Sequence, residues 1–77
     1  MKSAARISGD QVLARHAWLT GELGLRYVLA EKAYFLGDDL VVQAETMAGL
    51  ANEIKFRVAV QHAVDALRDR ATMTVIP

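Results

Sequence analysis

Two histidines, two serines and a few carboxylates are the side chains whose types could support catalysis or metal binding. The histidines, His16 and His62, form neither a Glu-x-x-His nor a His-x-x-x-His pattern, so the helical zinc and di-iron patterns are absent. Glu45 and Glu53 are eight positions apart, which is too far for a compact acid–base pair on one helix. The sequence therefore predicts a non-enzymatic protein without catalytic residues, metal ligands or cofactor, and it implies no small-molecule substrate.

The length and composition favour a single domain, residues 1–77, that gains stability from a partner. A chain of 77 residues buries only about 60% of the surface that its unfolded form exposes. It is 53% hydrophobic and has no cysteine, so disulfides cannot supplement the core and a reducing, cytoplasmic compartment is expected. Small domains without disulfides or metals often obtain the missing burial by oligomerising. We therefore expect a homodimer or a complex with a partner protein.

The charge balance counts against nucleic-acid binding, and the apolar segments count against a membrane span. Nine basic residues balance nine acidic ones, whereas a nucleic-acid binder normally shows a basic excess. No apolar run approaches the roughly 20 residues that span a bilayer, and the first ten residues lack the apolar core of a signal peptide. The one argument for a small DNA-binding regulator is a set of basic residues in the second half of the chain: Lys55, Arg57, Arg68 and Arg70.

A first helix is predicted to begin at about Gly9, after an N-terminal arm of residues 1–7. Ser8 is a suitable N-cap, and Gln11 completes a capping box. Gly21 and Gly24 then interrupt the apolar spacing. Either they allow a close approach of two helices, or the helix ends near Leu23 with Gly24 as its cap. For the following segment, "LRYVLAEKAYFL", the spacing favours a bent helix over an irregular connection.

A second helix is predicted to begin at about Asp39. Gly37 suits the end of the preceding helix, and Asp38 or Asp39 suits the next N-cap. From Ile54 to Val60 the apolar residues alternate as in a strand, so either one long helix changes its buried face near Phe56 or the chain breaks there. The change of period favours a break and a last helix from about Val60 to Arg70. An apolar tail, residues 71–77, would follow, either frayed or offered to a partner as an added strand.

These elements predict an all-α fold, a helical hairpin or a bundle of two to four helices that is completed by dimerisation or by a partner. The positions expected in the core are Val12, Leu19, Leu23, Leu36, Leu40, Met47, Leu50, Ile54, Val64 and Leu67. The acidic stretch from 38 to 53 contains no Lys or Arg, so it forms either a solvated helix face or a surface for a basic partner. The residues expected to bind a partner are Trp18, Asp38, Asp39, Glu45, Met47, Glu53 and Phe56.

The order of four short segments resembles an acyl carrier protein. "GELGL" (21–25) resembles the end of that family's first helix, and "LGDDL" (36–40) resembles the turn that holds its Asp-Ser-Leu motif. "ETMAGLANEIKFRV" (45–58) resembles the second helix, and "AVQHAVDAL" (59–67) the last. The resemblance covers about residues 12 to 68 and implies an all-helical carrier fold.

The serine that carries phosphopantetheine in that family has no counterpart here. The motif aligns it with Asp39 or Leu40, and neither side chain is a nucleophile. The resemblance therefore implies a carrier-like domain without a prosthetic group, in which only docking through Glu45 and Glu53 carries over. Three functions are left open by the sequence: a protein-interaction module such as a regulator, an inhibitor or a co-chaperone, a degenerate carrier-like docking domain, and a small DNA-binding regulator.

Overall fold

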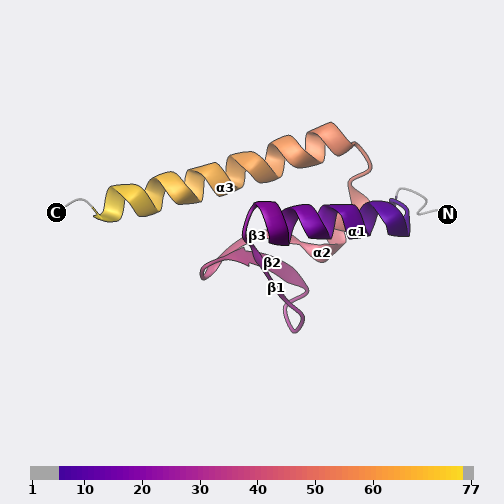
Figure 1. Ribbon diagram of the computed structural model, residues 1–77, viewed down its shortest axis with the longest axis horizontal. Helices are drawn as coiled ribbons and strands as arrows, with labels where there is room; N and C mark the ends of the chain where they lie inside the picture. The colour runs from indigo at the N-terminus through magenta and orange to yellow at the C-terminus, as the bar shows by residue number, and fades with distance from the viewer. Residues whose placement is uncertain (1–5, 76–77) are drawn as a thin grey trace.

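The computed structural model describes residues 6–75 and shows a small α+β fold, so the predicted all-α fold is wrong. Within residues 6–75, three α-helices and one π-helical turn accompany a three-stranded antiparallel sheet of order β1-β2-β3. In Figure 1, α3 runs along one side of the molecule and α1 and the sheet lie beside it. The helix α3 also contacts β3 directly, and an ion pair of 3.5 Å joins Arg70 to Asp39. The elements are α1 (Gly9–Ala17), η1 (Trp18–Glu22), β1 (Arg26–Val28), β2 (Ala33–Leu36), β3 (Asp39–Gln43), α2 (Ala44–Gly49) and α3 (Glu53–Val75).

The start of α1 confirms the predicted capping box. The Ser8 hydroxyl accepts a hydrogen bond from the Gln11 amide at 3.2 Å, and the Gln11 side chain accepts one from the Ser8 amide at 3.2 Å. The arm before the cap is attached to α2, because the Ile7 amide donates to the Ala48 carbonyl at 3.0 Å. The helix continues into η1 and ends at Leu23, with Gly24 at a φ of +72°. Of the two alternatives for the glycines, the helix end is confirmed.

Residues 26–36 form a β-hairpin, so the predicted bent helix is wrong. Tyr27 pairs with Tyr34 in antiparallel register, and a turn of four residues, 29–32, joins the two strands. The helical spacing of the leucines in this segment misled the prediction, because Leu29 lies exposed in the turn. Aromatic and β-branched residues favour extended backbone, and the fold buries Tyr34 almost completely. Burial of this one ring therefore outweighs the weak helical pattern.

Gly37 and Asp38 form the turn between β2 and β3 and not a helix boundary. Leu36 pairs with Asp39, which leaves a loop of two residues with Gly37 at a φ of +63°. A two-residue hairpin loop favours a first residue of positive φ, and glycine adopts it without steric cost. The predicted roles of Gly37 as a helix cap and of Asp38 or Asp39 as an N-cap are therefore wrong. The segment "LGDDL" belongs to a hairpin, so the all-helical fold implied by the carrier-protein resemblance is not observed.

The chain breaks at residues 50–52, earlier than predicted, and α3 then runs without interruption to Val75. The Asn52 side chain accepts a hydrogen bond from the Lys55 amide at 2.9 Å and so caps the start of α3. The apparent strand period arises because Phe56 and Val60 face the core while Ile54 and Val58 face outward. A helix that is apolar on two opposite faces imitates alternation over this short span. The predicted break near Phe56 and the end near Arg70 are therefore wrong.

The core lies between α1, η1, the inner face of the sheet and α3. Four of the predicted core residues, Leu19, Leu23, Met47 and Val64, are confirmed as buried, and Val12, Leu36 and Leu50 pack against them partly exposed. Leu67 is half-buried. Leu40 and Ile54 were predicted wrongly, since they are 51% and 77% exposed. The fully assembled cluster consists of Trp18, Leu19, Leu23, Leu25, Tyr34, Val42, Met47, Phe56, Val60 and Val64.

The two exposed positions, Leu40 and Ile54, lie near the ends of their elements. Leu40 lies on β3 just after the hairpin turn, and Ile54 lies in the first turn of α3 on its outer side.

Within residues 6–75, no helix has both the length and the apolar character that crossing a bilayer requires. The side chains of residues 72–77, which include most of the predicted apolar tail, lie outside the described part of the chain. The backbone of residues 71–75 is helical.

Candidate functional site

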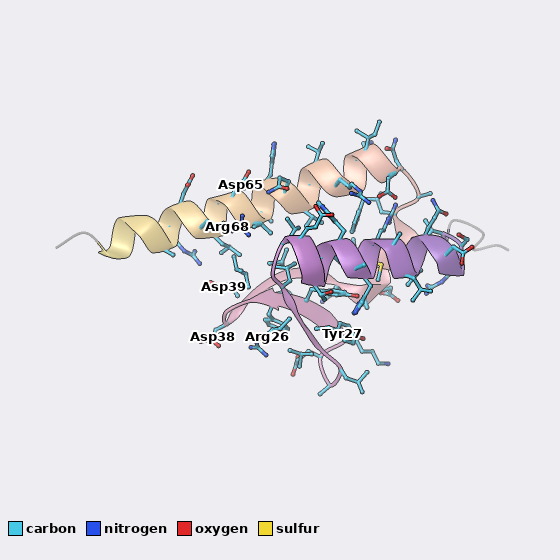
Figure 2. All side chains as sticks on the ribbon, viewed as in Figure 1. Arg26, Tyr27, Asp38, Asp39, Asp65 and Arg68 are labelled. Atoms are coloured by element: carbon cyan, nitrogen blue, oxygen red, sulfur yellow. The ribbon has the colours of Figure 1, made fainter. Side chains whose placement is uncertain are left out.

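The residues predicted to bind a partner do not form one surface. Trp18, Met47 and Phe56 are buried in the core. Asp38 and Asp39 lie at the turn between β2 and β3, on the exposed side of the molecule that Figure 2 shows around Arg26. The two remaining residues lie apart from that turn. Glu45 borders a pocket on α2, and Glu53 belongs to a charged cluster at the start of α3.

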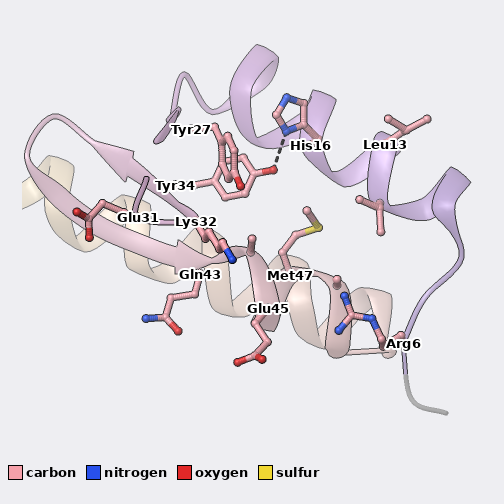
Figure 3. A pocket seen from close by; sticks show the side chains of 13 residues that line it. Arg6, Leu13, His16, Tyr27, Glu31, Lys32, Tyr34, Gln43, Glu45 and Met47 are labelled. Carbon is pink, nitrogen blue, oxygen red and sulfur yellow. Dashed lines mark hydrogen bonds between the residues drawn. The ribbon is translucent and has the colours of Figure 1, made fainter. Parts of the chain in front are cut away.

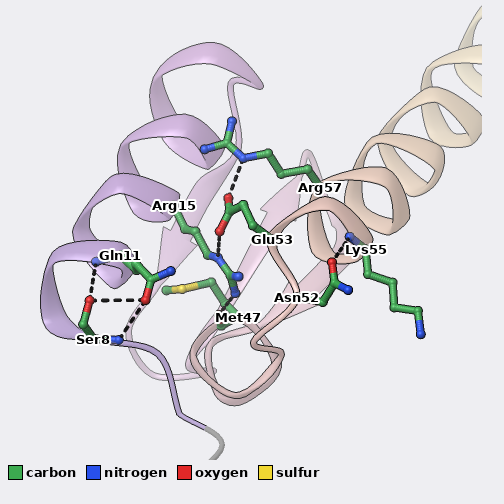
Figure 4. Close-up of polar contacts among 8 residues, drawn as sticks. All are labelled: Ser8, Gln11, Arg15, Met47, Asn52, Glu53, Lys55 and Arg57. Carbon is green, nitrogen blue, oxygen red and sulfur yellow. Dashed lines mark hydrogen bonds and ion pairs between the residues drawn. The ribbon is translucent and has the colours of Figure 1, made fainter.

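The charged cluster around Glu53 joins the three α-helices. Arg15 of α1 is completely buried, and its Nε lies 2.9 Å from Glu53 Oε1 of α3. Its Nη1 donates to the Met47 carbonyl of α2 at 2.6 Å, and its guanidinium lies 4.1 Å from the centre of the Phe56 ring. Figure 4 shows Arg15, Glu53 and Met47, with α1 at the left of the view and α3 at the right. A buried arginine requires such partners, because an unpaired buried charge is costly.

The second oxygen of Glu53 completes the cluster. Arg57 Nε donates to Glu53 Oε2 at 2.6 Å, and the Arg57 guanidinium lies 4.6 Å from the centre of the Trp18 ring. The hydrogen bond from Arg57, with that from Arg15 and the two positive charges, holds the pKa of Glu53 below its ordinary value against partial desolvation. Within the described residues, Arg15 Nη2 is buried without a hydrogen-bond partner. The three charged side chains, Arg15, Glu53 and Arg57, line none of the pockets found in the described residues, so we interpret them as structural.

A pocket of about 750 Å³ lies on the opposite side of α1, between that helix, the sheet and α2. Figure 3 shows His16 and Leu13 of α1 along one edge, the two tyrosines of the sheet beside them, and Met47 below. This volume lies within the range of about 300 to 1,000 Å³ that is common for small-molecule sites. The lining residues are Arg6, Val12, Leu13, His16, Tyr27, Glu31, Lys32, Tyr34, Gln43, Ala44, Glu45, Met47 and Ala48.

Three rings form one wall of this pocket. His16 Nδ1 and the Tyr34 hydroxyl are 2.6 Å apart and share a hydrogen bond. The ring centres of Tyr27 and Tyr34 are 4.8 Å apart, and the rings of His16 and Tyr27 meet edge to face at 6.0 Å. Burial, with a smaller effect of Tyr27, raises the pKa of Tyr34 above its ordinary value. The Tyr34 hydroxyl is protonated at neutral pH, as an ordinary tyrosine is, and its hydrogen bond with His16 joins α1 to β2.

Four charged side chains surround the opening of the pocket. Arg6 and Lys32 are cationic, Glu31 and Glu45 are anionic, and all four are exposed. The ion pairs found among residues 6–75 include none of them. Lys32 also has a φ of +51°, and it is the single non-glycine residue with positive φ in the described part of the chain. Residues other than glycine, asparagine and aspartate enter this region at an energetic cost.

A second exposed feature is the outer face of α3. The inner face contributes Phe56, Val60 and Val64 to the core, whereas Ile54 and Val58 are 77% and 49% exposed. Of the basic residues that suggested DNA binding, Arg57 is paired with Glu53, Arg70 with Asp39, and Arg68 donates to the Leu23 carbonyl. These side chains are engaged with other parts of the fold and do not form an open basic surface with Lys55.

Sequence reasoning did not find the pocket. His16 and Tyr34 meet only because residues 26–36 form a hairpin, and no local pattern signals that contact. Lys32 was not predicted as a site residue, because the segment was expected to be helical and its positive φ could not be foreseen. Within residues 6–75, no three His, Asp or Glu side chains lie close enough together to hold a metal ion. Comparison with protein-family models, with curated proteins and with solved structures gave no match. The carrier-protein resemblance therefore stays a prediction.

Proposed function

We propose that this protein is a non-enzymatic interaction module that forms a homodimer through the outer face of α3. The observation that carries the proposal is the exposure of Ile54 and Val58 opposite the buried side of the same helix. A surface helix normally has one apolar stripe, which faces the core. A second apolar stripe on a small domain is a typical feature of an interface between protein chains.

The charges along the same face favour a second copy of the chain as the partner. Its N-terminal part carries Lys55 beside Ile54 and Val58, whereas its C-terminal part carries Asp65 and Asp69, all of them exposed charges. Dimers with twofold symmetry bring the same surface of both copies together. An antiparallel pairing of two α3 helices places the basic end of one face against the acidic end of the other. A parallel pairing would place like charges together.

The length of α3 is also consistent with pairing. Its 23 residues correspond to about 34 Å of helix. Figure 1 shows its C-terminal end reaching beyond α1 and the sheet. Helices in proteins obtain most of their stability from packing rather than from intrinsic propensity. A second α3 would supply packing for the part that extends past the body of the domain.

Sedimentation velocity at micromolar concentrations tests the proposal, with wild type expected to be dimeric. Ile54→Glu places a charge within the apolar stripe of the proposed interface and should give a monomer. Leu29→Glu is the matched control, because Leu29 is 74% exposed at the turn between β1 and β2, and it should leave the dimer intact. A monomeric wild-type protein would refute the proposal. Equal dissociation by both variants would show that the α3 face is not the interface.

The antiparallel orientation has its own test. Lys55→Asp should weaken self-association by opposing the acidic end of the partner helix. Adding Asp69→Lys to the same chain should restore it, because the two ends have then exchanged their charges. The measurement is the dissociation constant of wild type and of both variants, at low and at high salt. It tests the antiparallel orientation. A double variant that associates as weakly as the single variant would contradict an antiparallel pairing.

A further inference from the structure

We propose that the pocket between α1, the sheet and α2 binds an aromatic zwitterion, specifically a free amino acid with an aromatic side chain. This inference does not depend on the proposed dimer, because no residue of α3 lines the pocket. The sequence implied no such ligand, since its determinants come together only in the folded chain. The ring wall, the charges at the opening and the conformation of Lys32 carry the proposal.

The ring wall suits a planar apolar group. Tyr27 and Tyr34 are 4.8 Å apart between ring centres, and His16 holds the Tyr34 hydroxyl at 2.6 Å. A wall fixed in this way loses little conformational freedom when a ligand ring packs against it. Leu13, which is exposed, and Met47, which is buried, provide aliphatic contacts on the remaining sides. Aromatic rings prefer such offset or edge-to-face neighbours.

The charges at the opening suit a ligand that carries both signs. In Figure 3 the Lys32 side chain lies between Glu31 and Glu45, with Arg6 near the end of the pocket. Two cations and two carboxylates line the pocket, and the ion pairs of the described residues include none of them. A purely anionic ligand would meet two repulsive carboxylates, and a purely cationic one would meet two repulsive cations. An α-amino acid presents a carboxylate to Lys32 and an ammonium group to the glutamates.

The backbone of Lys32 supports a role for its side chain. Its φ of +51° belongs to a region in which glycine is the residue of least cost. Its backbone is held on both sides, because its amide donates to the Leu29 carbonyl and its own carbonyl accepts from the Ala44 amide at 2.8 Å. Strained positions of this kind cluster at sites that bind ligands. A lysine here costs folding stability, and we infer that its amine contributes to binding.

Titrations followed by proton–nitrogen correlation spectra test the proposal with three related compounds. These are L-phenylalanine, which carries both charges, 3-phenylpropionate, which carries only the carboxylate, and phenethylamine, which carries only the ammonium group. Each is added to a concentration about tenfold above a millimolar Kd. L-phenylalanine should give saturable shifts at the amides of His16, Tyr27 and Lys32 and should bind more tightly than either partial compound. Absence of saturable shifts, or equal affinity for all three compounds, would overturn the proposal.

Charge-neutral variants locate the two contacts. Lys32→Gln should weaken L-phenylalanine binding roughly threefold to fivefold, as expected for an exposed ion pair, and leave phenethylamine binding undiminished. The double variant Glu31→Gln/Glu45→Gln should do the opposite, weakening L-phenylalanine and sparing 3-phenylpropionate. Lys55→Gln and Glu22→Gln are the matched controls, since both residues are exposed away from the pocket. Equal losses in controls and pocket variants would overturn the proposed contacts.

Lys32→Gly separates binding from folding. Glycine relieves the positive φ, so the variant should melt at the same temperature as wild type or higher. It should nevertheless bind L-phenylalanine as weakly as Lys32→Gln, because the amine is gone. A glycine variant that binds like wild type would show that the Lys32 side chain takes no part in the site.

Discussion

Arg15 and His16 are neighbours on α1, yet they belong to two regions with opposite properties. Arg15 points towards α2 and α3, where it is completely buried and bound by Glu53 and by the Met47 carbonyl. His16 points towards the sheet, where it meets Tyr34 at the wall of an open pocket. The charges on the first side are paired with one another, whereas those around the second are exposed and take part in none of the ion pairs described.

The difference separates groups that hold the fold from groups that are available to a ligand. A buried charge that loses its partner is penalised by desolvation, so the Arg15 cluster is costly to break. Exposed charges at a pocket opening contribute little to folding because water and salt screen them. Changes on the Arg15 side should therefore alter stability strongly, and changes at the pocket opening should alter binding with small effects on stability.

The largest effect is expected from Arg15→Ala. The change leaves the Met47 carbonyl without its donor and removes one partner of Glu53, and we expect a loss of about 3 kcal/mol of unfolding free energy. Urea unfolding followed by the fluorescence of Trp18, the single tryptophan, measures it. Arg26→Ala is the matched control. Arg26 is exposed, and its ion pair with Asp38 is long, at 3.9 Å. Losing that pair should lower the unfolding free energy by less than about 1 kcal/mol. Similar losses of unfolding free energy in both variants would contradict the view that the Arg15 cluster holds the fold.

An intermediate effect is expected from Tyr34→Phe. The variant keeps the buried ring but removes the hydroxyl that lies 2.6 Å from His16 Nδ1, and a lost hydrogen bond of this kind costs about 1 kcal/mol. The same unfolding experiment measures the loss, and histidine side-chain resonances report whether the His16 ring is still fixed. Tyr27→Phe is the control. Among the described residues, the hydrogen bond of His16 is made with Tyr34 and not with Tyr27. A variant as stable as wild type would mean that the His16–Tyr34 contact does not hold the wall.

The smallest effect concerns the pH dependence of Glu53. Arg57 and Arg15 lower the pKa of this carboxyl below its ordinary value of 4.5, so the unfolded state binds the proton more readily than the folded state. The stabilisation is fully present above pH 4.5 and is lost as the pH falls through the lower folded pKa. Its size is small because the Glu53 side chain is 38% exposed and solvent screens it.

Comparison of wild type with Glu53→Gln measures this contribution. The difference in unfolding free energy should be constant at neutral pH and should shrink as the solution is acidified below about pH 4.5. A difference that does not change with pH would show that the ionised carboxylate is not what the two arginines stabilise.

The parts of the fold that could be predicted are those governed by contacts within one or two turns. Ser8 and Gln11 cap each other across three positions. The helix end at Gly24 was one of the two alternatives, and glycine adopts the left-handed conformation there at least cost. The buried positions Leu19, Leu23, Met47 and Val64 followed from helical spacing within elements that are indeed helical. Leu40 failed because it lies on a strand, and Ile54 failed because it lies on the outer side of its helix.

The sheet could not be predicted because both hairpins depend on distant contacts. The segment from Leu25 to Leu36 satisfies a helical spacing as well as a strand pattern. Only the core formed by α1, η1 and α3 decides for the strand, by burying Tyr34 and Val42 together. The same holds for the candidate site. His16 and Tyr34 are 18 positions apart, and no sequence pattern around either residue predicts their contact.

By itself, the sequence determined a small cysteine-free chain of balanced charge and the start of its first helix at the Ser8–Gln11 capping box. The tertiary structure alone decided that Arg15 is buried against Glu53, that residues 26–43 form a sheet, and that His16, Tyr27, Tyr34 and Lys32 share one pocket. The physical reason is that caps and turns depend on neighbouring residues, whereas burial of a ring or a charge depends on which distant elements cover it.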